Sequence, residues 1–324
     1  MPAETLAFEG PLAKLLKEIN ALELRTRTDA RVNEIASLRR KVESIRKDLY
    51  ARLTPWQRVL VARHPGRPGL PDFIALLFTN FVEIHGDRRF ADDHAIMTGF
   101  AEYKGQPVLL VGHVKGGEDT KNKIFRNFGY ARPEGYRKAL RAMRLAEKFH
   151  RPIIVFIDTP AAYPGIESEE RGVAEAIAVN LRDMMLLDAP IIVIVSGEGG
   201  SGGALGIAIG DRVLMLEYAI CSVIPPEGCA AILWRDPAKK VEAAEALKIT
   251  APDLLKAGVI DAIIPEPVGG AHSDPPAAAA IVDTVLERAL REVSSLDSAR
   301  RLQLRYDKFR NMGRVGVEFV DEGS

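Results

Sequence analysis

The sequence predicts an α/β fold whose central strands are covered by helices on both faces. Apolar segments rich in Val and Ile, such as 151–159 and 189–197, alternate with amphipathic segments such as 137–150. Continuous apolar strands separated by helices are typical of sheets that are buried on both faces. A chain of 324 residues, of which 47% are hydrophobic and 27% charged, is large enough for one such core with appendages.

The N-terminal part of the chain, 1–60, is expected to form a helical arm. Apolar side chains recur at steps of three and four through 11–55, with Arg, Lys and Glu between them, and a break near Asp29 divides the segment into two helices. We expect this hairpin to pack against its own core or against a partner subunit. The rest of the chain is divided into a core, 61–290, and a C-terminal helix with a basic tail, 291–324.

The elements of the core are expected in a regular order. A loop at 65–71 precedes a helix at 72–86, and two strands within 96–113 flank a turn at Gly105. The alternation then continues through these expected elements: a helix at 137–150, a strand at 151–159, a helix at 169–188, a strand at 189–197, a short helix at 202–210, strand material at 212–224, helices at 236–248 and 251–258, a last strand at 259–267 and a helix at 277–296.

Two segments of the core repeat one pattern. "PIIVFIDTPAAYPG" (152–165) and "PIIVIVSGEGGSGG" (190–203) both lead from a proline through an apolar strand into a loop of small residues, and then into a helix. Such repetition predicts stacked β–loop–α turns with a site built along successive loops. The second loop opens "GEGGSGGALGIAIGD" (197–211), a glycine-rich stretch for which three interpretations are possible.

The first interpretation is a dinucleotide site. Gly197, Gly199 and Gly202 spell G-x-G-x-x-G, and Glu217 stands where an acid that binds a ribose would be wanted. The following helix, however, would have only about two turns.

The second interpretation is a serine hydrolase. Gly199, Ser201 and Gly203 spell the G-x-S-x-G nucleophile elbow, and Asp261 and His272 follow in the order of a hydrolase triad. His272 lies in a polar loop, "PVGGAHSDPP", and no further arrangement of residues supports a triad.

The third interpretation uses no side chain. Gly202 and Gly203 can present backbone N–H groups as an oxyanion hole, because glycine has no Cβ to hold a ligand away. Adjacent glycines also suit a tight turn with close packing between a helix and a strand. The pattern alone leaves these alternatives open.

Composition and charge exclude several classes of protein. Lys plus Arg and Asp plus Glu both number 44, so no overall field favours nucleic acid or a membrane surface. The two cysteines, Cys221 and Cys229, match no zinc-ligand spacing and are typical of a reducing compartment. The N-terminus lacks the features of a signal peptide, and no apolar run approaches the ~20 residues of a membrane span. We therefore expect a cytoplasmic protein.

Motifs spread over most of the chain resemble one family. In order across 112–272 stand "GHVKGGEDTKNKIFRNFGYARPEGYRKALRAMRLAEKF", "FIDTPAAYPG", "EERG", "GEGGSGGALGIAIGD", "SVIPPEGCAAILW" and "IIPEPVGGAH", and before them "ARHPGRP" and "HGDRRFADD". Together with the helical arm they are similar to alpha subunits of the acetyl-CoA carboxylase carboxyltransferase. The resemblance implies a crotonase-type fold of stacked β-β-α turns.

The resemblance also implies an activity and partners. The expected reaction moves a carboxyl group from carboxybiotin, on the biotin carboxyl carrier protein, to acetyl-CoA, which gives malonyl-CoA in the first committed step of fatty acid synthesis. The expected partners include biotin carboxylase and a zinc-ribbon beta subunit in an α2β2 heterotetramer, with the active site between alpha and beta. Carboxybiotin and acetyl-CoA are substrates, this chain is expected to bind no cofactor covalently, and zinc is expected only in the beta subunit. The lack of C-x-x-C here fits an alpha subunit.

Site residues follow from the same resemblance. The N–H groups of Gly202 and Gly203 are expected to be catalytic, because in the family adjacent glycines bind the ureido oxygen of biotin as it gains charge. The biotin enolate can then take the α-proton of acetyl-CoA, so no protein base is required. Substrate-binding residues are expected in four places: the two repeated loops, the segment just after the strand material at 212–224, and the basic segment. They are Ala161, Ala162, Tyr163, Pro164 and Gly165; Gly199, Gly200 and Ser201; Glu227 and Gly228; and Lys121, Lys123 and Arg126.

The basic segment has a local excess of positive charge. Residues 113–151 carry eleven Lys or Arg and four Asp or Glu. Such an excess favours the phosphates of CoA or an acidic carrier domain, and Lys121, Lys123 and Arg126 are the better candidates because they stand in a loop-like stretch. A solvated helix face explains Arg141, Arg144 and Lys148 at least as well.

Three residues depart from the family pattern. Ala161 stands in a usual glycine position, Pro225 in a usual serine position and Val173 in a usual glutamine position. If Ala161 needs a positive φ, alanine costs roughly 1 kcal/mol or turns the loop. These changes leave open a related acyl-CoA transcarboxylase or decarboxylase, or a catalytically decayed scaffold. The oxyanion-hole hypothesis predicts that Ser201→Ala is mild, and that Gly203→Val is severe because its Cβ fills the space of the biotin ring.

Overall fold

A single mixed sheet of eight strands forms the centre of the molecule in the computed structural model, which describes residues 6–24 and 28–313. The strand order is β1-β2-β3-β4-β5-β6-β8, and β7 pairs separately with β5. β2 is antiparallel to both of its neighbours, β1 and β3, and all other strand pairs are parallel. The strands are β1 Thr79–Glu83, β2 Ile96–Tyr103, β3 Gln106–His113, β4 Ile153–Thr159, β5 Ile191–Gly200, β6 Arg212–Leu216, β7 Ile220–Ser222 and β8 Ala262–Ile264.

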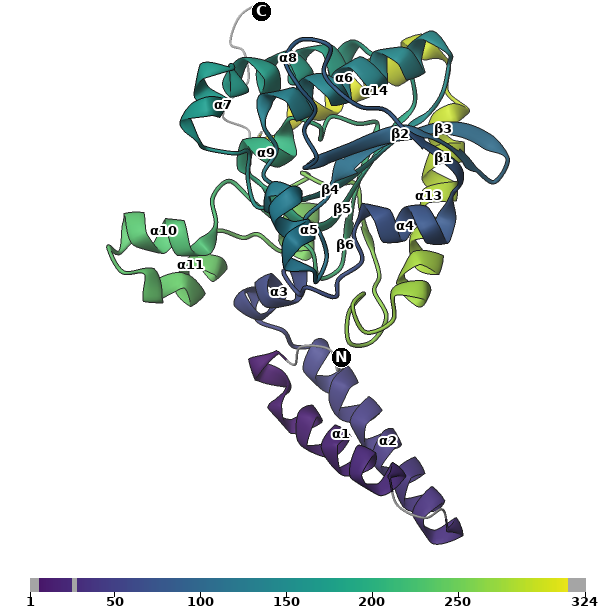
Figure 1. Cartoon of the computed structure of the whole chain (residues 1–324), viewed down its shortest axis with the longest axis vertical. Helices are drawn as coiled ribbons and strands as arrows, with labels where there is room; N and C mark the ends of the chain where they lie inside the picture. The colour runs from purple at the N-terminus through teal and green to yellow at the C-terminus, as the bar shows by residue number, and fades with distance from the viewer. Residues whose placement is uncertain (1–5, 25–27, 314–324) are drawn as a thin grey trace, which may run out of the picture.

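Helices lie on both sides of this sheet, as the apolar strands predict (Figure 1). α6 (Pro133–Lys148), α8 (Val173–Leu186) and α14 (Ser298–Asn311) form one group, and α4 (Leu70–Leu77) packs with α13 (Pro275–Ser294) in another (Figure 1). β4 is buried along its whole length because it is enclosed in this way. The other helices of the core are α3 Pro55–Ala62, α5 Thr120–Phe125, α7 Ile166–Glu170, α9 Ser201–Leu205, α10 Pro226–Leu233, α11 Lys240–Ala246 and α12 Ala251–Lys256.

The N-terminal arm is an antiparallel helical hairpin that projects from the core (Figure 1). α1 (Gly10–Glu23) and α2 (Asp29–Tyr50) bury Leu12, Ile19 and Val42 between them. Two helices with a break at Asp29 agree with the sequence prediction, and Thr28 caps α2 by accepting a hydrogen bond from the N–H of Arg31. Residues 1–5 and 25–27 of the expected arm lie outside the described residues.

The helix predicted at 72–86 is wrong over its second half. α4 ends at Leu77, and Thr79–Glu83 form β1 at the edge of the sheet, antiparallel to β2. The pairing depends on Gly99 of β2, where an added Cβ would lie 2.3 Å from the backbone oxygen of Val82. Sequence periodicity does not reveal such a tertiary contact, and "TNFVEI" continues the apolar pattern of the helix before it.

Part of the expected basic tail is an ordered helix. α14 carries Arg305, which is 1% exposed and pairs with Asp211 at 2.8 Å. The same guanidinium donates hydrogen bonds to the carbonyl oxygens of Met184, Leu187 and Ala189. α14 is thereby fixed to the start of β6 and the end of α8. Residues 314–324 of the expected tail lie outside the described residues, and the three-part division of the chain stays a prediction.

Within 6–24 and 28–313, no helix has both the length and the apolar character that crossing a membrane would need.

Candidate active site

The two repeated loops meet at the edge of the sheet where β4 and β5 end. Thr159 is in register with Gly199, so loop 160–165 after β4 lies beside the turn from β5 into α9. A Cβ added to Gly200 would lie 1.8 Å from the backbone oxygen of Pro160, and one added to Gly203 would lie 2.4 Å from the carbonyl carbon of Ala161. The glycines therefore allow direct contact between the two backbones. The structure brings together the residues that the sequence placed in these loops.

The start of α9 presents backbone donors. α9 spans five residues, Ser201–Leu205, and its first N–H groups have no carbonyl partner within the helix. At the end of the helix, the N–H of the C-cap residue Gly206 donates to the oxygen of Gly202 at 3.0 Å. The N–H groups of Gly202 and Gly203 thus remain outside the helix's own hydrogen-bond ladder. Gly202 is partly exposed, whereas Gly203 is buried.

The expectation that the Cβ of Gly203→Val fills the space of the biotin ring is wrong. The Cβ of a residue at 203 would strike Ala161 and Ala162 of the neighbouring loop rather than fill an open space. At Gly202 the nearest atom to an added Cβ is Cδ1 of Ile177, at 3.4 Å, which is an ordinary contact. Gly203 is therefore needed for the packing of the two loops, in addition to any role of its N–H group.

Buried polar groups hold α9 from behind. The hydroxyl of Tyr136 on α6 donates to the carbonyl oxygen of Gly203 at 3.3 Å. Asn180 on α8 donates to the carbonyl oxygens of Gly206, at 2.9 Å, and Tyr136, at 3.0 Å. Both side chains are 0–1% exposed. The direction of the N–H groups of α9 is thus set by α6 and α8.

Loop 160–165 is held by similar contacts. The hydroxyl of Thr159 donates to the carbonyl oxygen of Ala161 at 2.8 Å, and the N–H of Tyr163 donates to the oxygen of Ala131 at 2.9 Å. The guanidinium of Arg132 lies 4.8 Å from the ring centre of Tyr163. Ala162 forms a bridge with Ala131, Pro164 is exposed, and Gly165 is the N-cap residue of α7. This loop is ordered around the first turn of α9.

The structure does not place Ala161 in a conformation that needs glycine. Ala161 is absent from the residues with positive φ among those the structure describes, so its backbone does not require glycine. Pro225 is the N-cap residue of α10 with φ −56° and ψ 141°, and Val173 is the first residue of α8. The structure thus shows no strain from alanine at position 161.

An ion-pair network lies directly beneath the end of β5. Lys115 Nζ contacts Asp158 Oδ1 at 2.6 Å and Glu198 Oε1 at 2.7 Å. Arg63 joins Glu198, at 2.7 Å, to Glu227 on α10, at 2.6 Å. Burial opposes ionisation of the Glu198 carboxyl, yet Lys115 and Arg63 lower its pKa overall. Burial likewise opposes the charge of Lys115, but Asp158 and Glu198 raise its pKa.

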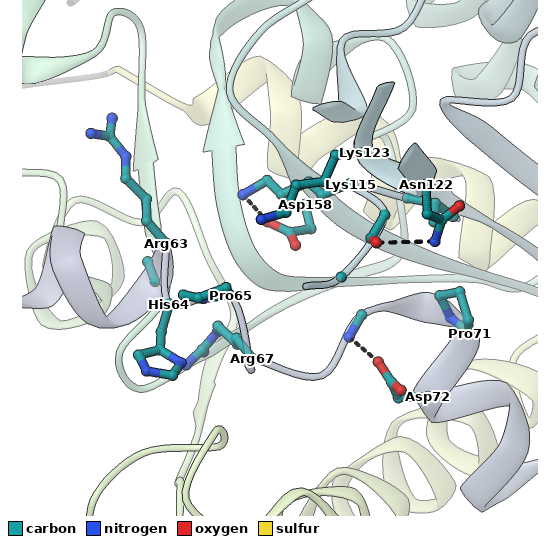
Figure 2. A pocket seen from close by; sticks show the side chains of 15 residues that line it. Arg63, His64, Pro65, Arg67, Pro71, Asp72, Lys115, Asn122, Lys123 and Asp158 are labelled. Carbon is teal, nitrogen blue, oxygen red and sulfur yellow. Dashed lines mark hydrogen bonds and ion pairs between the residues drawn. The ribbon is translucent and has the colours of Figure 1, made fainter. Parts of the chain in front are cut away.

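This network borders a cavity of about 240 Å³ that is shown in Figure 2. Lys115 and Asp158 point toward each other there, and Arg63, His64 and Arg67 come from the segment after α3 (Figure 2). Glu227, which the sequence analysis expected to bind substrate, is thus linked through Arg63 to Glu198 near the end of β5. Gly228 lies one residue further along α10, against Ile224.

The basic candidates are only partly brought to this cavity. Lys123 lines it beside Lys115, whereas Lys121 is exposed. Arg126 donates to the backbone oxygen of His94 at 3.0 Å. The segment that carries them is not a loop, because α5 spans Thr120–Phe125 and Asp119 caps it by accepting from two backbone N–H groups.

The hydrolase hypothesis is wrong. Ser201 has a positive φ of 49°, as an elbow would, but it follows the carboxyl end of β5. Asp261 precedes β8, at the opposite edge of these parallel strands, where it pairs with Lys308 at 2.8 Å. His272 stacks on His64 with ring centres 4.0 Å apart. The three residues therefore form no triad.

The dinucleotide hypothesis is also wrong. Gly197, Gly199 and Gly200 are part of β5, and the last two pair with β7, so these glycines form no turn around a phosphate. The carboxylate of Glu217 accepts a hydrogen bond from the N–H of Glu266 at 3.2 Å. The oxyanion-hole hypothesis therefore stays a prediction, and the close contact between Gly203 and loop 160–165 also agrees with a tight turn.

Sequence reasoning missed the residues of the ion-pair network other than Glu227 as site residues. Asp158 and Glu198 are charged residues within apolar strands, and they are 9% and 6% exposed. A charged residue inside an apolar strand needs a partner of opposite charge, and this rule could have identified Asp158 and Glu198 from the sequence. Their partners, Lys115 and Arg63, come from distant segments that the topology joins. Among the described residues, no three His, Cys, Asp or Glu side chains lie together as a metal site requires.

The fold is of the crotonase type, as predicted, and solved structures share it. The transcarboxylase 12S structure with methylmalonyl-coenzyme A and methylmalonic acid bound superposes with a TM-score of 0.57 at 20% identity, over 72% of this chain and 43% of that chain. The beta subunit of geranyl-CoA carboxylase from P. aeruginosa superposes with a TM-score of 0.55 at 16% identity, over 76% of this chain and 46% of that one. This chain thus spans less than half of either protein, and these likenesses show the fold.

The sequence gives the particular family. Residues 5–313 match the family described as acetyl co-enzyme A carboxylase carboxyltransferase-like, and the chain belongs to it. A relative from Geobacter metallireducens, named acetyl-coenzyme A carboxylase carboxyl transferase subunit alpha, is 54% identical over 95% of this chain and 97% of its own length. A relative of the same name from Geobacillus sp. is 54% identical over 98% of both chains.

Proposed function

We propose that this chain is the alpha subunit of a biotin-dependent acetyl-CoA carboxyltransferase. It takes the carboxyl group of carboxybiotin and passes it to acetyl-CoA, which gives malonyl-CoA. The observation that carries this proposal is the pair of N–H groups of Gly202 and Gly203 in the first turn of α9, in a chain that belongs to this family and matches named alpha subunits over 95–98% of its length.

In the proposed reaction, the bond between the ureido nitrogen of biotin and the carboxyl carbon breaks and releases CO2. The electron pair of that bond moves into the ureido group, and its oxygen gains negative charge. The N–H groups of Gly202 and Gly203 donate to this oxygen as the charge develops. One such preorganised donor is worth about 3–4 kcal/mol of barrier.

The biotin enolate then removes the α-proton of acetyl-CoA, and the resulting carbanion forms a carbon–carbon bond with CO2. This step needs no protein base. Such a mechanism agrees with the ion pairs beneath the site, since Asp158 and Glu198 are both engaged with Lys115. A carboxylate held in this way is a poor base because its pKa is lowered, as it is for Glu198.

We further propose the assembly that the family resemblance implies. A zinc-ribbon beta subunit completes the active site in an α2β2 heterotetramer, and the biotin carboxyl carrier protein and biotin carboxylase supply carboxybiotin. Lys123, beside the 240 Å³ cavity, is the basic candidate best placed to meet an anionic substrate group. A cytoplasmic location agrees with the two unpaired cysteines, Cys221 and Cys229.

The test is the reverse half-reaction, malonyl-CoA-dependent carboxylation of biocytin. It is run with this chain alone, with a zinc-ribbon beta subunit alone, and with both after co-expression. Activity in the mixture only is the expected result. An assembled α2β2 complex that is inactive with malonyl-CoA, while a well-characterised alpha subunit is active with the same beta subunit, would refute the proposal.

A further inference from the structure

A second cavity lies between α6, α8 and the loop that joins β1 to β2. Its volume is about 460 Å³, within the range of roughly 300–1,000 Å³ typical of small-molecule sites. None of the expected active-site residues lines it. The charged residues of its lining are Asp87, Arg88, Arg89, Arg137, Arg141, Arg144, Glu175 and Arg182.

The lining is strongly positive. Six arginines face two carboxylates, in a protein whose formal net charge is zero. Such a local excess costs free energy through repulsion between like charges, and an anion in the cavity would remove that cost. All of the positive charge in the lining comes from arginine, because no lysine lines the cavity. Guanidinium groups bind phosphate in a bidentate, directional manner that an ammonium group does not offer.

Three of the six guanidinium groups lack a carboxylate partner among the described residues. Arg137 pairs with Asp87, and Arg144 and Arg182 share Asp183. Arg141, by contrast, donates only to backbone oxygens of His85 and Gly86. Burial and the nearby Arg88 lower the pKa of Arg141, and together they outweigh the opposite effect of Asp87 and Asp92.

The other two groups without a carboxylate belong to Arg88 and Arg89, on the loop between β1 and β2. That loop is fixed by Asp87, whose Oδ1 accepts from the N–H groups of Arg89, Phe90 and Ala91 at 2.8–3.1 Å. Asp87 is 5% exposed, and Arg137 secures it from α6 at 2.8 Å. Arg88 has φ +62°, a conformation uncommon for a residue other than glycine. The ordered loop therefore presents two adjacent guanidinium groups to the cavity.

We propose that this cavity binds a small phosphorylated compound with a diphosphate group, of about the size of a nucleoside diphosphate. Arg88, Arg89 and Arg141 are the groups that bind the phosphates, because none of them forms an ion pair with a carboxylate among the described residues. The concave shape and nucleotide-scale volume favour a small molecule over a flat acidic protein surface. The binding does not depend on the carboxyltransferase activity proposed above.

The test measures binding rather than activity. The full chain, co-purified with its beta subunit, is titrated by calorimetry with inorganic pyrophosphate, ADP and CoA at low and at physiological ionic strength. The double variant Arg88→Ala/Arg89→Ala is compared with Arg39→Ala/Arg40→Ala, a matched pair of adjacent arginines on α2. We expect the first variant to weaken binding of pyrophosphate and ADP at least about tenfold, and the second to leave it unchanged.

Thermal unfolding of both variants checks that they fold, and we expect Arg88→Ala/Arg89→Ala to fold normally, since these side chains hold no other element. Repeating the titrations with saturating malonyl-CoA separates two sources of the diphosphate. Unchanged ADP binding assigns the cavity to a free phosphorylated compound, and competition assigns it to the diphosphate of CoA. Absence of binding by all three probes, or binding that Arg88→Ala/Arg89→Ala leaves unchanged, would overturn the proposal. So would loss of carrier-protein binding in that variant without any binding of the phosphates.

Discussion

Replacement of Gly203 by alanine tests the candidate site most directly, because the structure specifies what the new methyl group meets. Its Cβ would lie 2.4 Å from the carbonyl carbon of Ala161, 2.5 Å from the nitrogen of Ala162 and 2.9 Å from the oxygen of Ala161. Non-bonded carbon atoms prefer separations of about 3.5–4.0 Å. All three neighbours are backbone atoms, so no change of side-chain rotamer relieves the contact. Loop 160–165 and α9 must separate by about 1 Å.

The size of the effect follows from this displacement. Overpacking of a close contact costs about 1–3 kcal/mol of stability. A displacement of about 1 Å at reacting groups costs on the order of 100-fold in rate, and misdirecting one oxyanion-hole donor costs about 100- to 1,000-fold. We therefore expect Gly203→Ala to lower kcat of biocytin carboxylation at least about 100-fold, with a smaller loss of stability.

Gly202→Ala is the matched control. Its Cβ would have only Cδ1 of Ile177 nearby, at 3.4 Å, and its N–H group is retained. Alanine within a helix is favoured over glycine by roughly 1 kcal/mol, so this variant is expected to be as stable as the parent chain or slightly more so. It separates the cost of an added methyl group in α9 from the cost of the contact with loop 160–165.

The assay combines kinetics and unfolding on complexes of each variant with the beta subunit. Urea denaturation gives stability, gel filtration confirms assembly, and malonyl-CoA-dependent carboxylation of biocytin gives kcat and KM. If Gly203→Ala assembles and keeps the kcat of the parent chain, the position of α9 against the loop does not govern the reaction, and the reasoning is refuted. Equal loss of kcat in both variants with unchanged stability would instead attribute the effect to the ligand space rather than to the loop contact.

Four further predictions follow from the same contacts. Ser201→Ala is expected to keep kcat within about tenfold, since no triad surrounds the serine; a loss of 1,000-fold or more would restore a nucleophilic role. Lys115→Met leaves two carboxylates without their shared ammonium and is expected to cost about 3 kcal/mol in urea denaturation, which Lys115→Arg should partly restore. Arg305→Met removes the buried partner of Asp211 and is expected to cost about 3–5 kcal/mol, whereas Arg291→Met on the exposed face of α13 should be neutral. Burial lowers the pKa of His113 to about 3, against about 6.5 in the unfolded chain, so the unfolded state binds one more proton between these values and stability falls as the pH drops below about 6.5. Between pH 7 and pH 5 this residue alone should remove about 2 kcal/mol, a loss that His113→Gln abolishes and His150→Gln, at an exposed position, does not.

The sequence predicted those features that depend on local chemistry. The apolar strands at 151–159 and 189–197 gave β4 and β5, and the repeated loops after them meet in the structure. Adjacent glycines predicted a close approach of backbone, which is what Gly200 and Gly203 provide. The family resemblance agreed with the match of residues 5–313, because glycine-rich motifs of this length are specific.

Features that depend on tertiary contacts were not predictable in the same way. β1 was assigned to a helix because its edge pairing rests on Gly99, which lies in another strand. The partners of Glu198 are Arg63, just after α3, and Lys115, just after β3, and only the topology joins these segments. The direction of the Cβ at Gly203 likewise depends on which loop lies opposite. The sequence pattern indicates that position 203 needs glycine, but only the structure shows that the reason is the contact with loop 160–165.

The ion pairs beneath the site explain why backbone donors, rather than side chains, fit the proposed reaction. Arg63 and Lys115 both pair with Glu198 of β5, and each is bound to two carboxylates at 2.6–2.7 Å. Held in this way, Glu198 has a lowered pKa and is a weak base, and the two cations are already neutralised by their partners. The network therefore fixes the ends of β4 and β5 without adding a reactive group. In the proposed reaction, the charge that develops on the ureido oxygen is instead stabilised by the N–H groups of Gly202 and Gly203, whose strength as donors does not depend on pH.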